Sequence, residues 1–131
     1  MFVDANIFII AALQASGNGQ KCREFIKKIE AGEQRSITSV LVLDEVLNSI
    51  EIHTGSRVKA KSIVEKILST QNLEICEVNM KQFGKSIKYF EAGLRPRDAL
   101  HVAVMLEQGV TTILSFDRDF DSIPAIKRQE P

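Results

Sequence analysis

The sequence predicts an α/β protein with three layers (α/β/α), in which helices cover both faces of a mostly parallel sheet of four to five strands. Short apolar runs alternate along the chain with longer stretches of helical periodicity, the pattern of strand–helix–strand units with right-handed crossovers. The length of 131 residues suits one domain, spanning 1–131, around a single core. With 44% hydrophobic and 26% charged residues, the composition excludes a disordered or fibrous chain.

The overall charge narrows the choice of partners. The 17 basic and 17 acidic residues balance, so any contact with nucleic acid must use a local patch rather than a generally cationic surface. No apolar run approaches the roughly 20 residues that cross a bilayer, and no basic region precedes a cleavage site near Met1. We therefore expect a cytoplasmic protein without membrane contact. Cys22 and Cys76 have no metal-binding or redox spacing, which favours buried free thiols.

The first part of the chain contains a short strand and two helices. Residues 1–3 are expected to form a buried strand that ends at an acid, Asp4. The apolar residues 7–13 predict a buried helix, and the small polar cluster at 16–19 ends it as a loop. Residues 21–31 alternate between apolar and charged positions at the helical period, so a second helix follows with its charged side in solvent.

The middle of the chain begins with a predicted strand at 35–39. Thr38 or Ser39 can cap the helix that follows at 40–53, which is apolar on most sides and is therefore expected to be buried. Glu45 lies in the middle of this helix, where a carboxylate needs either a partner or a function.

The remaining elements continue the alternation of helix and strand. Three further helices are predicted from amphipathic spacing, at 57–68, 80–92 and 96–108. Pro96 opens the last of them, because proline is tolerated best at the first position of a helix. Strands are predicted at 73–78, at 111–115 and, as a short edge strand, at 123–127.

The predicted topology places four acids at one edge of the sheet. Asp4 closes the first strand and Asp117 follows the fourth, so both lie beyond the carboxyl ends of parallel strands, where such sheets bind ligands. The last helix runs antiparallel to the strand that it feeds, which brings Asp98 to the same edge. Glu45 is in the second turn of a helix that begins there, and helix side chains lean toward the N-terminus. Taken alone, Asp4 would be explained by capping of the next helix, but the other three acids favour a site.

A cluster of carboxylates repels itself, and a divalent cation is the usual compensation. Mg²⁺ and Mn²⁺ prefer oxygen ligands and leave positions for substrate phosphate. Held by Asp4, Asp98 and Asp117, directly or through water, such an ion could lower the pKa of a bound water and polarise a phosphoryl oxygen. The arrangement therefore predicts phosphodiester hydrolysis, with Glu45 orienting a water or binding a second ion.

The order and spacing of these residues resemble the PIN domain family over essentially the whole chain. The matching segments are Asp4-Ala5-Asn6, Thr38-Ser39 with Glu45, Arg97-Asp98-Ala99-Leu100-His101-Val102-Ala103, and Ser115-Phe116-Asp117-Arg118-Asp119-Phe120. The chain is most similar to the small stand-alone VapC-type toxins of bacteria and archaea. That resemblance implies a Mg²⁺- or Mn²⁺-dependent endoribonuclease acting on RNA, commonly a homodimer and often neutralised by a small antitoxin protein.

The resemblance also implies roles for individual residues. Carried over by position, the core acids and the fourth acid are Asp4, Glu45, Asp98 and Asp117. The family varies at the fourth position, so Asp119 is an alternative ligand there. Asn6 and Ser115 are expected to be supporting polar groups near the metal.

Other residues near the predicted site have plainer explanations. His101 lies one turn after Asp98 on an apolar helix, which favours a packed or hydrogen-bonded histidine over a metal ligand. Arg95 and Arg97 flank the site and could hold substrate phosphate, although surface solubility explains them equally well. Asp44 is expected to face solvent or to be paired.

Three other functions stay open. A phosphatase with Asp4 as its nucleophile usually needs a second acid two residues later, where this chain has Asn6. A catalytically silent PIN-like module would bind RNA or a protein without cutting, but such a module would be free to lose one of the acids. A PIN nuclease of RNA processing would need no antitoxin. For a homodimer, the apolar helix pair at 40–53 and 57–68 could supply the interface.

Overall fold

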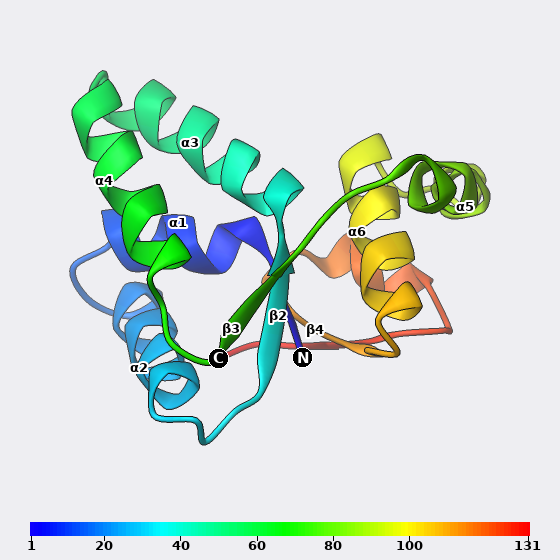
Figure 1. The fold of residues 1–131 in the computed structure, drawn as a ribbon, viewed down its shortest axis with the longest axis horizontal. Coiled ribbons are helices and arrows are strands. Elements are labelled where there is room, and N and C mark those ends of the chain that lie inside the picture. Colours follow the sequence, from blue (N-terminus) through cyan, green and yellow to red (C-terminus); the bar gives the residue numbers. More distant parts are fainter.

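The computed structural model describes residues 1–131 and contains one sheet of five parallel strands in the order β3-β2-β1-β4-β5 (Figure 1). The strands are β1 (Phe2–Val3), β2 (Ser36–Ser39), β3 (Leu73–Cys76), β4 (Thr112–Leu114) and β5 (Lys127–Gln129). Helices cover both faces of this sheet, so the predicted α/β/α class with a parallel sheet is confirmed.

Six α-helices connect the strands. They are α1 (Ala5–Leu13), α2 (Asn18–Glu30), α3 (Val40–Thr54), α4 (Arg57–Leu68), α5 (Met80–Glu91) and α6 (Pro96–Glu107). The helices α1 to α4 pack together on one side, at the left and top of Figure 1, and α5 packs against α6 on the other side. The chain moves from β1 outward to β3 and then returns to β4, and right-handed crossovers in opposite directions put their helices on opposite faces.

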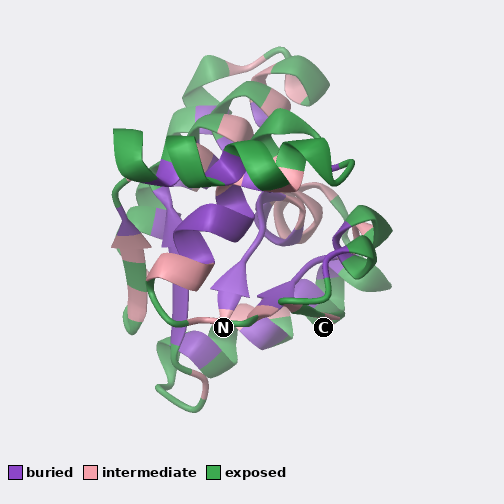
Figure 2. Cartoon of the chain, turned by 90° about the vertical axis from the view of Figure 1, so that its right-hand side faces the viewer, coloured by how far each residue is buried: buried purple, intermediate pink, exposed green.

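The core is built around the central strands. Both residues of β1 are completely buried, as are Ile113 and Leu114 of β4, and Figure 2 shows these strands enclosed by helices whose outer sides are exposed. Cys22 and Cys76 are free, buried thiols, as predicted. No helix combines the length and the apolar character that a membrane span requires.

Several predicted boundaries are wrong by a few residues. Helix α1 begins directly after Asp4, two residues earlier than predicted, because the Asp4 side chain caps it. Helix α2 begins at Asn18, within the expected loop, because Gly17 already makes the turn with a positive φ of 61°. Strand β5 begins only at Lys127, the last residue of the predicted edge strand, since the residues before it form a turn in which Ile126 donates its N–H to the carbonyl of Ile123 at 3.2 Å.

Helix α3 is less buried than its apolar composition predicted. It packs against α1 and α4, which leaves the side away from them in solvent. Ile52 is 71% exposed and Leu47 is 41% exposed. Apolar composition therefore overstated the burial of this helix, and only its inner stripe contributes to the core.

Candidate active site

The candidate site lies where the strand order reverses, between β1 and β4. Parallel sheets bind ligands in the crevice beyond the carboxyl ends of such a pair of strands. Val3 pairs with Leu114, so the next residues, Asp4 and Ser115, leave the two strands side by side. The N–H of Asp4 donates to the carbonyl of Leu114 at 3.1 Å, which fixes the backbone that carries the first acid.

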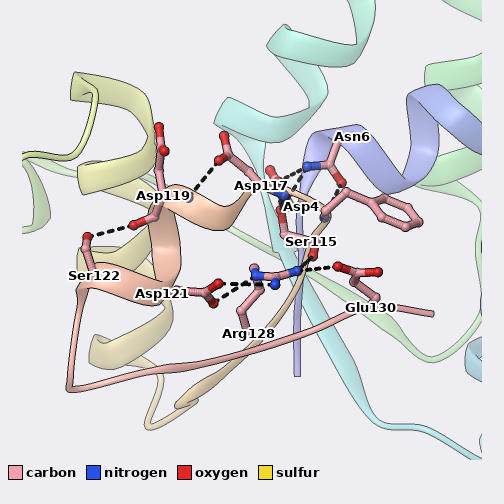
Figure 3. A network of polar contacts seen from close by, with 10 residues as sticks. Asp4, Asn6, Ser115, Asp117, Asp119, Asp121, Ser122, Arg128 and Glu130 are labelled. Atoms are coloured by element: carbon pink, nitrogen blue, oxygen red, sulfur yellow. Dashed lines mark hydrogen bonds and ion pairs between the residues drawn. The ribbon is translucent and has the colours of Figure 1, made fainter.

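Asp4 is held by three hydrogen bonds. It is 6% exposed, and its Oδ1 accepts from the N–H of Ala5 at 2.7 Å. Its Oδ2 accepts from Asn6 Nδ2 and from Ser115 Oγ, each at 2.6 Å. Figure 3 shows these side chains turned toward one another, and Asn6 Nδ2 also donates to Ser115 Oγ at 2.8 Å. Asp4 therefore both caps α1 and lies at the crevice, so the capping explanation and the site explanation are compatible.

The surroundings of Asp4 shift its titration. Burial raises the pKa of the Asp4 carboxyl, while the imidazole of His101 and the hydrogen bonds from Ser115 and Ala5 oppose that rise. The negative charge of Glu45 raises the pKa of Asp4 further. The three donors replace much of the hydration that burial removes, which is how a charge is kept at this position.

A cleft of about 530 Å³ lies over Asp4 and also holds the other three predicted acids. Its lining residues are Asp4, Ala5, Asn6, Ile9, Glu45, Arg95, Pro96, Arg97, Asp98 and Asp117. Four remote segments therefore supply acids to one cleft: the end of β1, α3, the start of α6 and the loop after β4. A larger cleft of about 800 Å³ between α1, α2 and α4 contains none of these acids, so the chemistry of the lining identifies the candidate site.

The pKa of Asp98 reflects the repulsion among the carboxylates in the cleft. Partial burial raises the pKa of its carboxyl to about 6; the imidazole of His101 opposes the rise, whereas the negative charges of Asp4, Asp117 and Glu45 add to it. Three separate carboxylates thus act on Asp98 from across the cleft. Such a cluster favours the binding of positive charge.

The two candidates for the fourth acid differ in position. Asp117 lines the cleft, and its backbone N–H donates to Ser115 Oγ at 3.0 Å. Asp119 is exposed and does not line the cleft. The backbone N–H of Asp119 donates to Asp117 Oδ1 at 2.9 Å, which caps the short 3₁₀ helix Arg118–Ser122 (Figure 3). The geometry therefore favours Asp117 as the acid that faces a ligand.

Glu45 has a partner that topology alone did not indicate. Its Oε1 lies 2.7 Å from Nε2 of His101, and the imidazole is completely buried. The His101 ring packs beside the ring of Phe2, with centroids 5.5 Å apart and planes inclined by 43°. His101 is thus a packed, hydrogen-bonded histidine, as predicted.

Two arginines form the rim of the cleft. Arg95 and Arg97 both line it, and both are exposed. Arg97 Nη2 lies 3.8 Å from Asp44 Oδ2, an exposed ion pair that links the start of α6 to α3. Asp44 is therefore both exposed and paired, and the rim carries positive charge above an acidic floor.

The sequence did not predict the supporting hydrogen bonds that two residues make near the site. Arg128 of β5 donates through Nη1 to the carbonyl of Ser115 at 3.1 Å and through Nε to Asp121 at 2.9 Å (Figure 3). Thr38 Oγ1 donates to the carbonyl of Val3 at 2.9 Å. Both brace the backbone next to the first acid. Nothing in a polar tail after the last predicted strand distinguishes such an arginine, whereas Thr38 belonged to a segment already singled out.

The donor set suits a hard cation in its chemistry. All the candidate ligands are oxygen atoms, the type that Mg²⁺ and Mn²⁺ prefer. No three acidic, histidine or cysteine side chains in the chain come together closely enough to ligate one ion by themselves. A cation in this cleft would therefore complete its coordination with water, which Mg²⁺ commonly retains.

Comparisons with known proteins agree on one family. The family model described as PIN domain matches residues 1–126. A relative from Mycobacterium bovis, VapC ribonuclease Mb1869c, is 26% identical over 134 residues, covering 98% of this chain and 98% of the relative.

Solved structures show the same fold. The crystal structure of Mycobacterium tuberculosis VapC20, described as a Sarcin-Ricin loop cleaving toxin, is similar with a TM-score of 0.74 at 20% identity, covering 92% of each chain. VapBC2 from Rickettsia felis, solved bound to a DNA fragment from its promoter, is similar with a TM-score of 0.75 at 16% identity, covering 98% of this chain and 96% of that one. At these identities the likeness establishes the fold.

Proposed function

The chain belongs to the PIN domain family, and from that premise we propose that it is a metal-dependent endoribonuclease, the toxin of a VapBC-type toxin–antitoxin pair. The observation that carries the proposal is the cleft in which carboxylates from four remote segments meet. The ribonuclease named among its relatives supports the choice of RNA as substrate.

The proposed roles follow from the positions of the side chains. Asp4, Asp98 and Asp117 hold Mg²⁺ or Mn²⁺, in part through water, and Glu45 orients a water or binds a second ion. A cation held there would supply positive charge for the phosphodiester and would lower the pKa of a bound water. Asp119, exposed beside Asp117, is the less favoured ligand.

The remaining polar residues prepare the site for a phosphodiester. Asn6 and Ser115 fix both the position and the orientation of the Asp4 carboxylate through their hydrogen bonds. Arg95 and Arg97 on the rim offer guanidinium groups to substrate phosphates, since an acidic floor alone would repel RNA. The two arginines would thus attract the RNA backbone that the acids of the cleft are proposed to cleave.

Cleavage of a structured RNA tests the proposal. The purified chain should cut the RNA with added Mg²⁺ or Mn²⁺ and should stop when EDTA is added. Glu45→Gln, purified in parallel, should lose roughly 100-fold or more of the activity, whereas Glu65→Gln on the outer side of α4 should match the wild type. Cleavage that continues in EDTA, or none with any metal, contradicts the proposal.

The alternative functions make different predictions in the same experiment. A silent PIN-like module would bind RNA or a protein partner but leave RNA intact with every metal; the complete set of acids in the cleft argues against it. A PIN nuclease of RNA processing would cut RNA but would have no neutralising partner. Co-expression with the product of the gene immediately upstream distinguishes it from a toxin, because an antitoxin should co-purify and suppress cleavage.

We also propose that the chain forms a homodimer, and helix α5 offers the more continuous apolar surface for it. Met80, Phe83, Ile87 and Phe90 are 82%, 52%, 45% and 52% exposed. Their spacing places them along one side of α5, the helix that lies across the front of Figure 2. The predicted interface on α3 and α4 exposes more scattered apolar residues, such as Val58 at 80%.

The four residues are self-complementary under a two-fold axis. When two copies of α5 pack antiparallel about the helix centre, Phe83 meets the partner's Ile87, and Met80 meets the partner's Phe90. Phe83→Lys and Ile87→Glu should each give monomers in sedimentation, and mixing the two variants should restore a dimer through the new Lys–Glu contact. Val58→Glu is the control for the α3–α4 surface; dissociation by this change alone would place the interface there.

A further inference from the structure

The contact between His101 and Glu45 joins two helices beneath the cleft. Glu45 projects from α3 and His101 from α6, 56 residues apart in the chain, and Nε2 of the ring lies 2.7 Å from Oε1 of the carboxylate. An ionised carboxylate only accepts hydrogen bonds, so Nε2 carries the hydrogen in this contact. The second carboxylate oxygen, Oε2, makes no hydrogen bond within the chain and belongs to a residue that lines the cleft.

We propose that His101 is a positioning residue that holds the Glu45 carboxylate in the orientation a cation or its bound water needs. This inference deepens the function proposed above and rests on it. A glutamate side chain has three rotatable bonds, and fixing it costs conformational entropy. The hydrogen bond from His101 to Oε1 fixes the Glu45 side chain before any ligand binds, so this entropy is lost on folding and not on binding. It leaves Oε2 free to contact the ligand.

The position of His101 excludes direct roles. The side chain is completely buried, and its Nε2 is already committed to Glu45. Its Nδ1 makes no hydrogen bond and is also buried, so neither ring nitrogen reaches a phosphate or a cation in the cleft. His101 therefore acts on the site through Glu45, and it is neither a metal ligand nor a general acid.

The unsatisfied nitrogen also argues that the histidine is more than packing. A buried polar atom without a hydrogen-bond partner, such as Nδ1 of His101, is destabilising. A phenyl ring at this position would keep an aromatic contact with Phe2 and would carry no unsatisfied nitrogen. The hydrogen bond to Glu45 is the one contact of His101 that a phenyl ring could not make, and it accounts for an imidazole at this position.

Two substitutions separate positioning from packing. His101→Phe keeps the ring and removes the donor, whereas His101→Gln places an amide N–H near the position of Nε2. Mn²⁺ binding, followed by EPR without RNA, should weaken about tenfold or more in His101→Phe and less than about threefold in His101→Gln. In a Glu45→Gln background, His101→Phe should have no further effect on Mn²⁺ affinity, because the residue through which it acts is already neutral.

NMR of the metal-free protein gives a readout that is independent of both metal and RNA. The Nε2–H of His101 should appear as a slowly exchanging ring proton, and its resonance should move in Glu45→Gln. Equal Mn²⁺ affinity in the two His101 variants, or the same loss with and without Glu45, overturns the positioning role and leaves packing. Failure to cut RNA would count against the proposed nuclease while leaving these binding and NMR results to decide the role of His101.

Discussion

Replacing Asp98 with asparagine should stabilise the metal-free protein at neutral pH. The pKa of Asp98 is raised to about 6 in the folded chain, against about 3.9 for an unperturbed aspartate. Between these values the folded chain binds more protons than the unfolded chain, so stability falls as the pH rises through this window. Above this pH window, the full loss of folding stability is present. Asparagine removes that loss because it carries no charge.

The magnitude follows from the shift. About two pKa units correspond to about 3 kcal/mol, and solvent screening at this partly exposed carboxyl reduces the effect to about 1–2 kcal/mol. Asparagine also gives up a favourable charge in the first turn of α6, which costs about 0.5 kcal/mol. The expected net gain is about 1 kcal/mol, a rise in the unfolding midpoint of roughly 3–5 °C for a chain of this length.

Thermal denaturation in EDTA measures this gain, at about pH 7.5 and again at about pH 4.5. The gain should shrink at the lower pH, where Asp98 of the folded wild type is already protonated. Glu65→Gln is the matched control: its exposed ion pair with Lys61 at 3.4 Å lies on α4, so the free energy of unfolding should change by less than about 0.5 kcal/mol. Added Mn²⁺ should then stabilise the wild type more than Asp98→Asn, because the variant has lost a proposed ligand.

The opposite sign in EDTA would refute this reasoning. If Asp98→Asn loses more than about 1 kcal/mol at about pH 7.5, the carboxylate is a structural partner of the α6 N-terminus or of a rim arginine. Repulsion among the acids would then be too weak to favour a cation. An equal change in Glu65→Gln would show that the effect reflects overall charge and not the cleft.

Three further substitutions distinguish the acids from one another. Asp4→Asn should lose roughly 1–2 kcal/mol of stability in EDTA, because one of the donors from Ala5, Asn6 and Ser115 would face the new amide N–H; urea denaturation checks this, and a gain in stability would contradict it. Asp117→Asn should lower RNA cleavage by about tenfold or more, whereas Asp119→Asn should change it less than about threefold. Cleavage assays at saturating Mn²⁺ measure both, and the reverse order would make Asp119 the fourth acid.

Topology alone was enough to bring the acids together. The order of strands and helices decides which ends share an edge, and it needs no side-chain coordinates to place Asp4, Asp98 and Asp117 there. The fold class could be predicted for the same reason. The predicted roles of these residues as ligands depend on chemistry that the cleavage and binding experiments address.

The contacts that the sequence did not predict depend on how helices are rotated relative to one another and on short-range details of the chain. The pair of Glu45 and His101 requires the angle at which α3 faces α6, and helical periodicity in one segment says nothing about the facing side of another. Arg128 reaches Ser115 from β5, which begins four residues later than the predicted edge strand, a shift that alternation in a three-residue strand could not indicate. Helix α1 begins two residues earlier than predicted because Asp4 caps it, and a capping side chain sets a helix boundary more sharply than apolar content does.

The same topology that concentrates negative side chains also offsets them. Three helices begin at this edge of the sheet, after Asp4, Ser39 and Arg95. Each helix start carries a partial positive charge of about +0.5 from its aligned peptide dipoles. Asp4 caps the first of these helices, Glu45 lies in the second turn of α3, and Asp98 lies in the first turn of α6. The three acids Asp4, Glu45 and Asp98 therefore lie near positive helix ends, which offset part of their mutual repulsion in the metal-free chain.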